Sequence, residues 1–172
     1  MLVIAQNVDI LRRLDAAFFQ VGEARGGLLV KFYGGEKDPA VELRASLEEN
    51  GLGVGDLEAG GALSHEARGG PLGGLGGDAL GQILEEETER GRAVWASFDW
   101  ALRVDLETAL EHQGKLNKLV DSSQLMVKTA VENAIEGWTP SHLRRAQSAH
   151  SAMILASEGG LSLSRATPMP PS

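Results

Sequence analysis

Short apolar runs alternate with amphipathic stretches along the 172 residues of this chain, and this alternation constrains the fold more than any other feature. An apolar run of about four to eight residues between turn residues is typical of a buried strand, and an apolar period of about 3.6 residues is typical of a helix. Strands that alternate with helices build a parallel sheet, because each crossover helix packs back onto it. The sequence therefore predicts a single α/β domain with a mainly parallel sheet and crossover helices on both faces.

The strongest predicted strands should lie side by side in the centre of the sheet. They are the runs LVIA (2–5), LLVKFY (28–33), VWASF (94–98) and LMVKTAV (125–131). Weaker strand patterns occupy 62–67 and 151–155. The proline-rich end, SRATPMPPS, has little to bury. We therefore expect the domain to span 1–157 and residues 158–172 to form a flexible C-terminal tail.

Helix patterns fill the segments between these strands. The first helix should present one apolar face made of Ile10, Leu14, Ala17, Phe18 and Val21. Asp38-Pro39 and Thr139-Pro140 are cap-then-proline helix starts, Asn50-Gly51 is a helix stop, and Asp78 is a candidate N-cap. The acidic run Glu85, Glu86, Glu87 and Glu89 should face solvent, and a long helix should cover about 102–120.

More than half of the 22 glycines fall between Gly51 and Gly81, and one group of them matches the sequence motif of a dinucleotide-binding turn. Residues 74–79 fit the pattern G-x-G-x-x-A. That turn belongs directly after the first strand and opens a helix, whereas here it follows the third predicted strand after several further residues. We therefore interpret 69–77 as a connecting loop and leave open whether it acts as a lid.

The junction between the first strand and the first helix argues against a nucleotide-hydrolysing enzyme. A phosphate-binding loop needs glycines and a Lys-Ser/Thr pair there, because backbone amides and the lysine hold the phosphates. Residues 6–9 are Gln-Asn-Val-Asp, without glycine or lysine. We therefore expect no turnover of ATP or GTP and no Walker A loop.

Composition narrows the class of protein further. The formal net charge is −8, which disfavours direct binding of nucleic acid, and the chain has no cysteine and therefore no disulfide or thiolate metal site. No apolar run approaches ~20 residues, and the N-terminal stretch lacks the pattern of a secretory signal, so we expect a cytoplasmic protein without a membrane segment. The histidines lack zinc-site spacing, and no nucleophile elbow occurs, so we expect no metal, no cofactor and no catalytic residue.

The second half of the chain carries a recognisable order of motifs. A strand ending in Trp100-Ala101-Leu102 is followed by a helix with Glu111 and Leu116-Asn117, another strand, and then Thr-Pro-x-x-Leu with a late histidine. The matching positions in that last part are Pro140, Leu143 and His150. This order resembles the MEDS family, the methanogen/methylotroph DcmR sensory domain. The resemblance implies a RecA/KaiC-like fold without a phosphate loop, and a role in sensing small organic ligands for signalling or transcriptional control.

We expect the ligand site where the clearest strand meets the next helix, since ligands of open α/β sheets bind at the carboxyl ends of the strands. The candidate ligand-binding residues are Phe98, Asp99, Trp100, Arg103, Glu111, His150 and Asn7. For each, a structural role competes: Trp100 as a core residue, Asp99 as a helix cap, Glu111 as the partner of Lys115 on a solvated face, and His150 as a satisfied buried polar group.

The functional prediction is thus a non-catalytic sensory domain for a small organic molecule, with a signalling or regulatory protein as its output partner. Two other functions stay open: a degraded nucleotide-binding protein, and a protein-interaction module without a small ligand. The sequence is compatible with a homodimer and names neither the ligand nor the partner.

Overall fold

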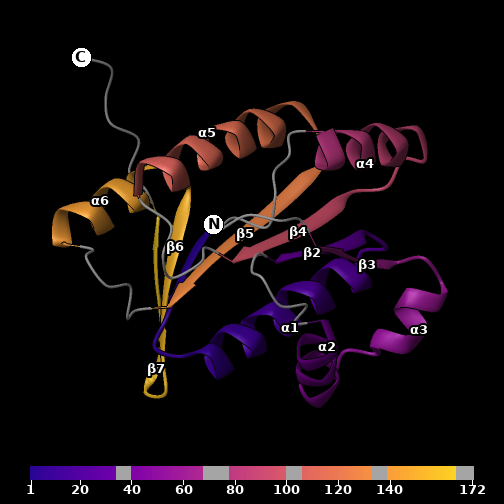
Figure 1. Cartoon of the computed structure of the whole chain (residues 1–172), viewed down its shortest axis with the longest axis horizontal. Helices are drawn as coiled ribbons and strands as arrows, with labels where there is room; N and C mark the ends of the chain where they lie inside the picture. The colour runs from indigo at the N-terminus through magenta and orange to yellow at the C-terminus, as the bar shows by residue number, and fades with distance from the viewer. Residues whose placement is uncertain (34–39, 68–77, 100–105, 133–138, 166–172) are drawn as a thin grey trace.

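The computed structural model describes residues 1–33, 40–67, 78–99, 106–132 and 139–165. It contains a seven-stranded sheet in the order β3-β2-β4-β5-β1-β6-β7, with helices on both sides (Figure 1). β1 to β6 run parallel and β7 pairs antiparallel with β6. The predicted α/β class with a mainly parallel sheet is therefore confirmed.

Six of the seven strands lie where the apolar runs predicted them. The bounds of all seven are β1 Leu2–Ala5, β2 Leu28–Tyr33, β3 Leu63–Ala67, β4 Val94–Asp99, β5 Leu125–Glu132, β6 Ala152–Ser157 and β7 Gly160–Arg165. The four predicted central strands β2, β4, β5 and β1 are indeed consecutive neighbours in the sheet. Parallel strands buried on both faces need nearly continuous apolar sequence, which is why these runs were recognisable.

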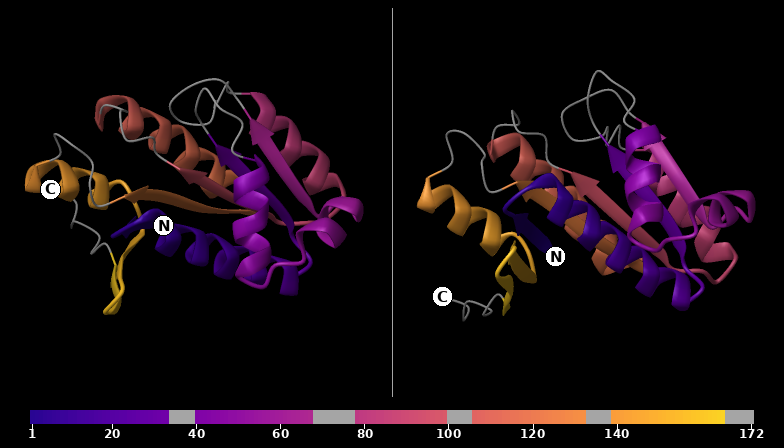
Figure 2. Two further views of the ribbon diagram at one scale, coloured as in Figure 1. Left: turned by 60° about the horizontal axis from the view of Figure 1, so that its bottom comes forward. Right: turned by 90° about the horizontal axis from the view of Figure 1, so that it is seen from below.

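Two layers of helices cover the sheet (Figure 2). One layer holds α1 (Val8–Ala24), α2 (Ala40–Glu49) and α3 (Val54–Ala59), and the other holds α4 (Asp78–Glu89), α5 (Leu106–Ser122) and α6 (Pro140–Ser148). Thr139 caps α6 as predicted, its hydroxyl accepting a hydrogen bond from the backbone N–H of His142. α2 ends at Glu49, and Gly51 has a φ of 91°, a conformation that glycine adopts without strain. The predicted start at Asp38-Pro39 lies outside the described residues.

Alternate residues of each strand feed two separate cores. Phe32, Ala96 and Phe98 face α4 and α5 and belong to an apolar cluster with Leu80 and Leu116. Residues of opposite parity face α1 and α2, and these include Leu29 and Trp95, which pack with Phe19. The first face is apolar through the middle of the sheet, whereas the second changes from apolar to charged towards the ends of the strands.

The buried face of α1 differs from the predicted one. The buried residues are Ile10, Leu11, Asp15, Ala16, Phe19 and Gly22. The predicted Ala17 and Val21 are exposed instead, and Leu14 and Phe18 are only half-buried. The prediction holds for Ile10, and Leu14 and Phe18 pack against the core. It was wrong for Ala17 and Val21 and missed Asp15, because it sought apolar residues alone, whereas the helix turns this charged residue towards the sheet.

Two further predictions are corrected. Glu87 belongs to the acidic run that should face solvent, yet only 3% of its surface is exposed, because Arg90 and Arg92 pair with its carboxylate. Residues 160–165, assigned to the tail, form β7 by a hairpin with β6. The segment 166–172 lies outside the described residues. No described helix is long and apolar enough to span a membrane.

Candidate functional site

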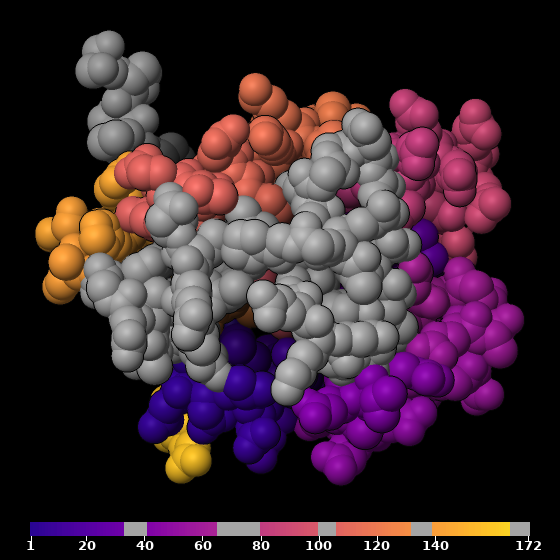
Figure 3. All heavy atoms as spheres, in the orientation of Figure 1, coloured from indigo at the N-terminus to yellow at the C-terminus, as the bar shows by residue number. Residues whose placement is uncertain are grey.

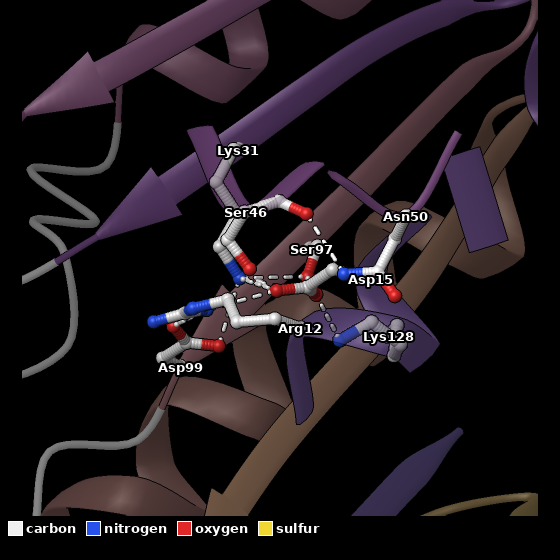
Figure 4. A network of polar contacts seen from close by, with 8 residues as sticks. All are labelled: Arg12, Asp15, Lys31, Ser46, Asn50, Ser97, Asp99 and Lys128. Atoms are coloured by element: carbon white, nitrogen blue, oxygen red, sulfur yellow. Dashed lines mark hydrogen bonds and ion pairs between the residues drawn. The ribbon is translucent and has the colours of Figure 1, made fainter. Parts of the chain in front are cut away.

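A row of polar side chains crosses the middle of the sheet under α1 (Figure 4). Lys31 on β2 pairs in register with Ser97 on β4, which pairs with Lys128 on β5. All three side chains are at least 99% buried, with 0% exposure for Lys31 and Ser97 and 1% for Lys128. Two lysines within otherwise apolar central strands require compensating negative charge, because burying an isolated ammonium is costly.

Asp15 of α1 supplies that compensation from above the row. Its Oδ1 lies 2.5 Å from Lys128 Nζ and accepts a 2.7 Å hydrogen bond from Ser97 Oγ. Its Oδ2 lies 3.1 Å from Lys31 Nζ and 2.9 Å from Arg12 Nη1. The carboxylate is fully buried and joins one helix to three strands.

Asp99, the last residue of β4, is the second carboxylate of the cluster. Its Oδ1 accepts a 2.8 Å hydrogen bond from Lys31 Nζ, and its Oδ2 accepts a 2.9 Å hydrogen bond from Arg12 Nη1. Lys31 and Arg12 therefore each bridge both carboxylates. The side chains of Arg12 and Asp99 are 20% and 21% exposed, so this end of the cluster reaches the surface while the end at Lys128 does not.

The pKa shifts follow from this geometry. Burial by itself would raise the pKa of Asp15, but Lys128, Lys31 and Arg12 outweigh it and hold that pKa far below its usual range. Burial also opposes ionisation of Asp99, yet Lys31 and Arg12 lower its pKa. Burial lowers the pKa of Lys128 more than Asp15 raises it. Both carboxylates are ionised at neutral pH.

The cluster holds three cationic side chains and two carboxylates, so it carries excess positive charge when all five are ionised. In the part of the chain that the structure describes, Arg12 makes its hydrogen bonds through Nη1 alone. Its Nη2 and Nε groups bond to none of these described residues and are available as donors. A guanidinium edge with two such donors matches a carboxylate or another oxyanion, which can accept both bonds at once.

The exposed end of the cluster lies at the carboxyl edge, by which we mean the edge where β1 to β6 end. This is the edge at which open parallel sheets bind ligands. Figure 3 shows the described helices of the two layers on opposite sides of the molecule, α1 and α2 below and α4 and α5 above. The segments that follow β2, β3, β4 and β5 at this edge lie outside the described residues, including the glycine-rich 69–77.

Two of the predicted site residues lie at the carboxyl edge of the sheet, on the face that α1 covers. Asp99 is the carboxylate just described, and Asn7 follows β1 as the N-cap of α1, accepting a 3.0 Å hydrogen bond from Ile10 N. Gln6 and Asn7 alone connect β1 to α1, so this junction holds no phosphate loop. Phe98 instead points to the opposite face, fully buried and stacked on Phe32 at 4.5 Å between ring centroids.

The other predicted site residues do not join this cluster in the described structure. Glu111 is 73% exposed and pairs with Lys115 at 3.4 Å, the structural role considered above. Trp100 and Arg103 lie outside the described residues. Among the predicted site residues that the structure describes, only Asp99 takes part in the charged cluster.

His150 lies at the opposite, amino edge of the sheet. It is buried with Nδ1 2.7 Å from the carbonyl oxygen of Ala146, and burial lowers its pKa to about 4. It lines a groove of about 640 Å³ together with Gln113 and Asn117. Gln113 accepts a hydrogen bond from Thr129 and donates one to Asn117, which donates to the carbonyl oxygen of Ala149. These bonds tie α5 to the turn after α6.

Sequence reasoning missed most of the cluster: Arg12, Asp15, Lys31, Ser97 and Lys128. A signal was nevertheless present. Lys31 interrupts LLVKFY, Lys128 interrupts LMVKTAV, and Ser97 precedes the end of VWASFD, each within a strand expected to be buried on both faces. Two lysines in buried strands predict a partner carboxylate nearby.

No protein-family model matches this chain, and neither does any curated protein. Among the described residues, no group of three histidine, aspartate or glutamate side chains could hold a metal ion.

Proposed function

We propose that this protein is a non-catalytic sensory domain that binds a small organic acid at the carboxyl edge of its sheet. The observation that carries the proposal is the charge of the cluster beneath α1, where three basic side chains face two carboxylates and Arg12, among the described residues, keeps two donor groups unused. A ligand carboxylate on Nη2 and Nε would balance the excess charge. The order of motifs that resembles the MEDS sensory family supports a sensing role.

The cluster also offers a way to transmit binding. Arg12 belongs to α1, whereas Asp99 ends β4 and leads directly into the segment 100–105. A ligand anion on Nη2 and Nε would draw the Arg12 guanidinium towards itself and weaken the 2.9 Å contact between Nη1 and Asp99. Binding would thereby change how the end of β4 is held against α1, which is a change that a partner protein can detect.

The direct test is thermal stabilisation by acids and by their neutral analogues. Acetate, succinate and benzoate are compared with the corresponding primary amides at constant ionic strength. Since a ligand that binds the folded state raises the melting temperature by mass action, we expect at least one acid to do so and its amide to have no effect. Equal stabilisation by acid and amide would contradict the proposal.

Two variants of α1 assign the effect to Arg12. Arg12→Lys keeps the positive charge but loses the planar pair of donors, so we expect binding of the stabilising acid to weaken about tenfold or more. The matched control is Arg13→Gln, because Arg13 is the next residue of the same helix and is exposed. Unchanged affinity in Arg12→Lys, or an equal loss in Arg13→Gln, would exclude Arg12 as the anion site.

A further inference from the structure

The outer edge of β7 is an open strand edge with apolar side chains. β7 is last in the strand order, and among the described residues no strand pairs with its outer side. Leu161 and Leu163 are 66% and 62% exposed. Natural sheets usually protect such edges with lysine, proline or a bulge, because an open edge templates further pairing. Residues 160–164 are Gly-Leu-Ser-Leu-Ser and contain no charged residue or proline.

The hairpin register determines which backbone groups point outward. β6 and β7 are joined by the two-residue turn 158–159, and Ser157 pairs with Gly160. In such a hairpin the closing pair exchanges hydrogen bonds, and bonded and non-bonded pairs then alternate along the ladder. The backbone N–H and C=O groups of Leu161 and Leu163 therefore point away from β6, towards the open edge.

The leucine side chains lie on one face. Leu161 is opposite Ala156 and Leu163 is opposite Ile154, and directly opposed residues of an antiparallel pair share a face. Ala156 and Ile154 belong to the apolar cluster under α1. The two leucines thus extend that apolar face beyond the edge of the core.

We propose that a second copy of this chain covers this edge, with β7 pairing antiparallel to β7 of the partner about a twofold axis at Ser162. This register places Leu161 of one copy opposite Leu163 of the other, so four leucines form one apolar patch. The outward N–H and C=O groups of these leucines then face each other and can exchange hydrogen bonds. A shift of this register by one residue would place each leucine opposite a serine and turn the partner's leucines to the other face of the sheet.

Charge complementarity favours the same arrangement. Arg165, at the end of β7, comes opposite Gly159 of the other copy and hence next to its Glu158. Both side chains are exposed in the single chain. The twofold axis produces this contact between opposite charges twice, once at each end of the paired strands. The sheet would become continuous across the dimer.

The oligomeric state is tested by sedimentation velocity across a range of protein concentrations. We expect a species of twice the mass of the chain, which Leu163→Lys converts to monomer, because an ammonium would face the partner's leucine. The control is Val41→Lys, since Val41 is 78% exposed on α2, and it should remain dimeric. A parent protein that is monomeric throughout, or a Leu163→Lys variant that stays dimeric, would overturn the proposal.

Cysteine cross-linking tests the register, and the absence of native cysteine makes the result unambiguous. Residues on the twofold axis of a non-bonded pair have Cα atoms about 4.5 Å apart, within the range of a disulfide. Under mild oxidation we expect Ser162→Cys to give a covalent dimer and Ser164→Cys to give little. A dimer that cross-links through Ser164→Cys, or through neither, would exclude pairing centred on Ser162.

Discussion

The carboxylate of Asp15 lies 2.5 Å from the ammonium of Lys128, and both side chains are essentially removed from solvent. The pair joins the third turn of α1 to the middle of β5. Buried pairs of this kind are costly to break from one side, because the remaining charge is left without compensation. The folded state therefore depends on Asp15 for much more than packing.

Asp15→Asn should lower the free energy of unfolding by about 3–5 kcal/mol, because Lys31, Lys128 and Arg12 lose their shared counter-charge. Urea unfolding at neutral pH measures the change. Glu23→Gln is the control, since Glu23 is exposed on the same helix, and it should change stability by less than about 0.5 kcal/mol. Similar losses in both variants would show that the cluster is not a special source of stability.

Adding Lys128→Met to Asp15→Asn should recover part of the lost stability, because the uncompensated ammonium is removed with its partner. Unfolding curves of the two single variants and the double variant form a double-mutant cycle. The coupling should be on the order of 1–3 kcal/mol and favourable. Additive losses would contradict a direct interaction between the two side chains.

Stability should fall in weak acid because of buried neutral histidines. His112 is 5% exposed, its ring lies 5.3 Å edge-on from Phe98, and neither ring nitrogen has a hydrogen-bond partner among the described residues. Burial, with a smaller effect of Lys115, lowers the pKa of His112 from 6.5 to about 4. The unfolded chain thus binds a proton first, and stability drops as pH falls from about 6.5 to about 4.

His112→Phe should make this drop shallower by on the order of 2–3 kcal/mol, because phenylalanine cannot bind the proton. Unfolding is measured at several pH values between 8 and 4. His150, whose pKa is also lowered to about 4, should keep part of the slope. The values at pH 8 provide the reference, since both histidines are neutral there. An identical slope in the variant would contradict the buried neutral state of His112.

Gly22 and Gly114 give opposite predictions for the same substitution. A Cβ on Gly22 would fall 2.6 Å from Leu29 Cδ2 and 2.7 Å from Trp95 Cγ, so Gly22→Ala should cost about 1–3 kcal/mol through overpacking. A Cβ on Gly114, within α5, would meet no described atom within 4 Å beyond its chain neighbours and the backbone of its own helix. Gly114→Ala should therefore stabilise the protein by about 0.5–1 kcal/mol. The melting temperatures of the two variants provide the test. A gain of stability in both Gly22→Ala and Gly114→Ala would contradict the close approach of α1 to Trp95.

Glu87→Gln should destabilise the end of α4 by about 1 kcal/mol, because Glu87 holds Arg90 and Arg92 after the helix. These arginines lower the pKa of Glu87 against the effect of burial, so its contribution is present at neutral pH and lost as pH falls. Glu86→Gln is the exposed control in the same run. Equal effects of the two substitutions on urea unfolding would indicate that Glu87 is solvated like Glu86.

The sequence by itself determined six of the seven strands, most helix positions and the α/β class, because these depend on local features. LLVKFY and LMVKTAV are recognisable as buried parallel strands from apolar content alone, and Thr139-Pro140 starts α6 by local capping. The connection at Gln6 and Asn7 was likewise recognisable from the sequence as a junction without a phosphate loop. Asp99 was identified because it ends the clearest strand.

Only the tertiary structure decided which charges meet. Asp15 is separated from Ser97 by 82 residues and from Lys31 by 16, and no local pattern relates them. Their contact depends on the register of β2, β4 and β5 and on the rotation of α1, which turns Asp15 towards the sheet. The same holds at the edge, where β7 exists because β6 offers it a partner. Long-range pairing energies, rather than local propensity, fix both features.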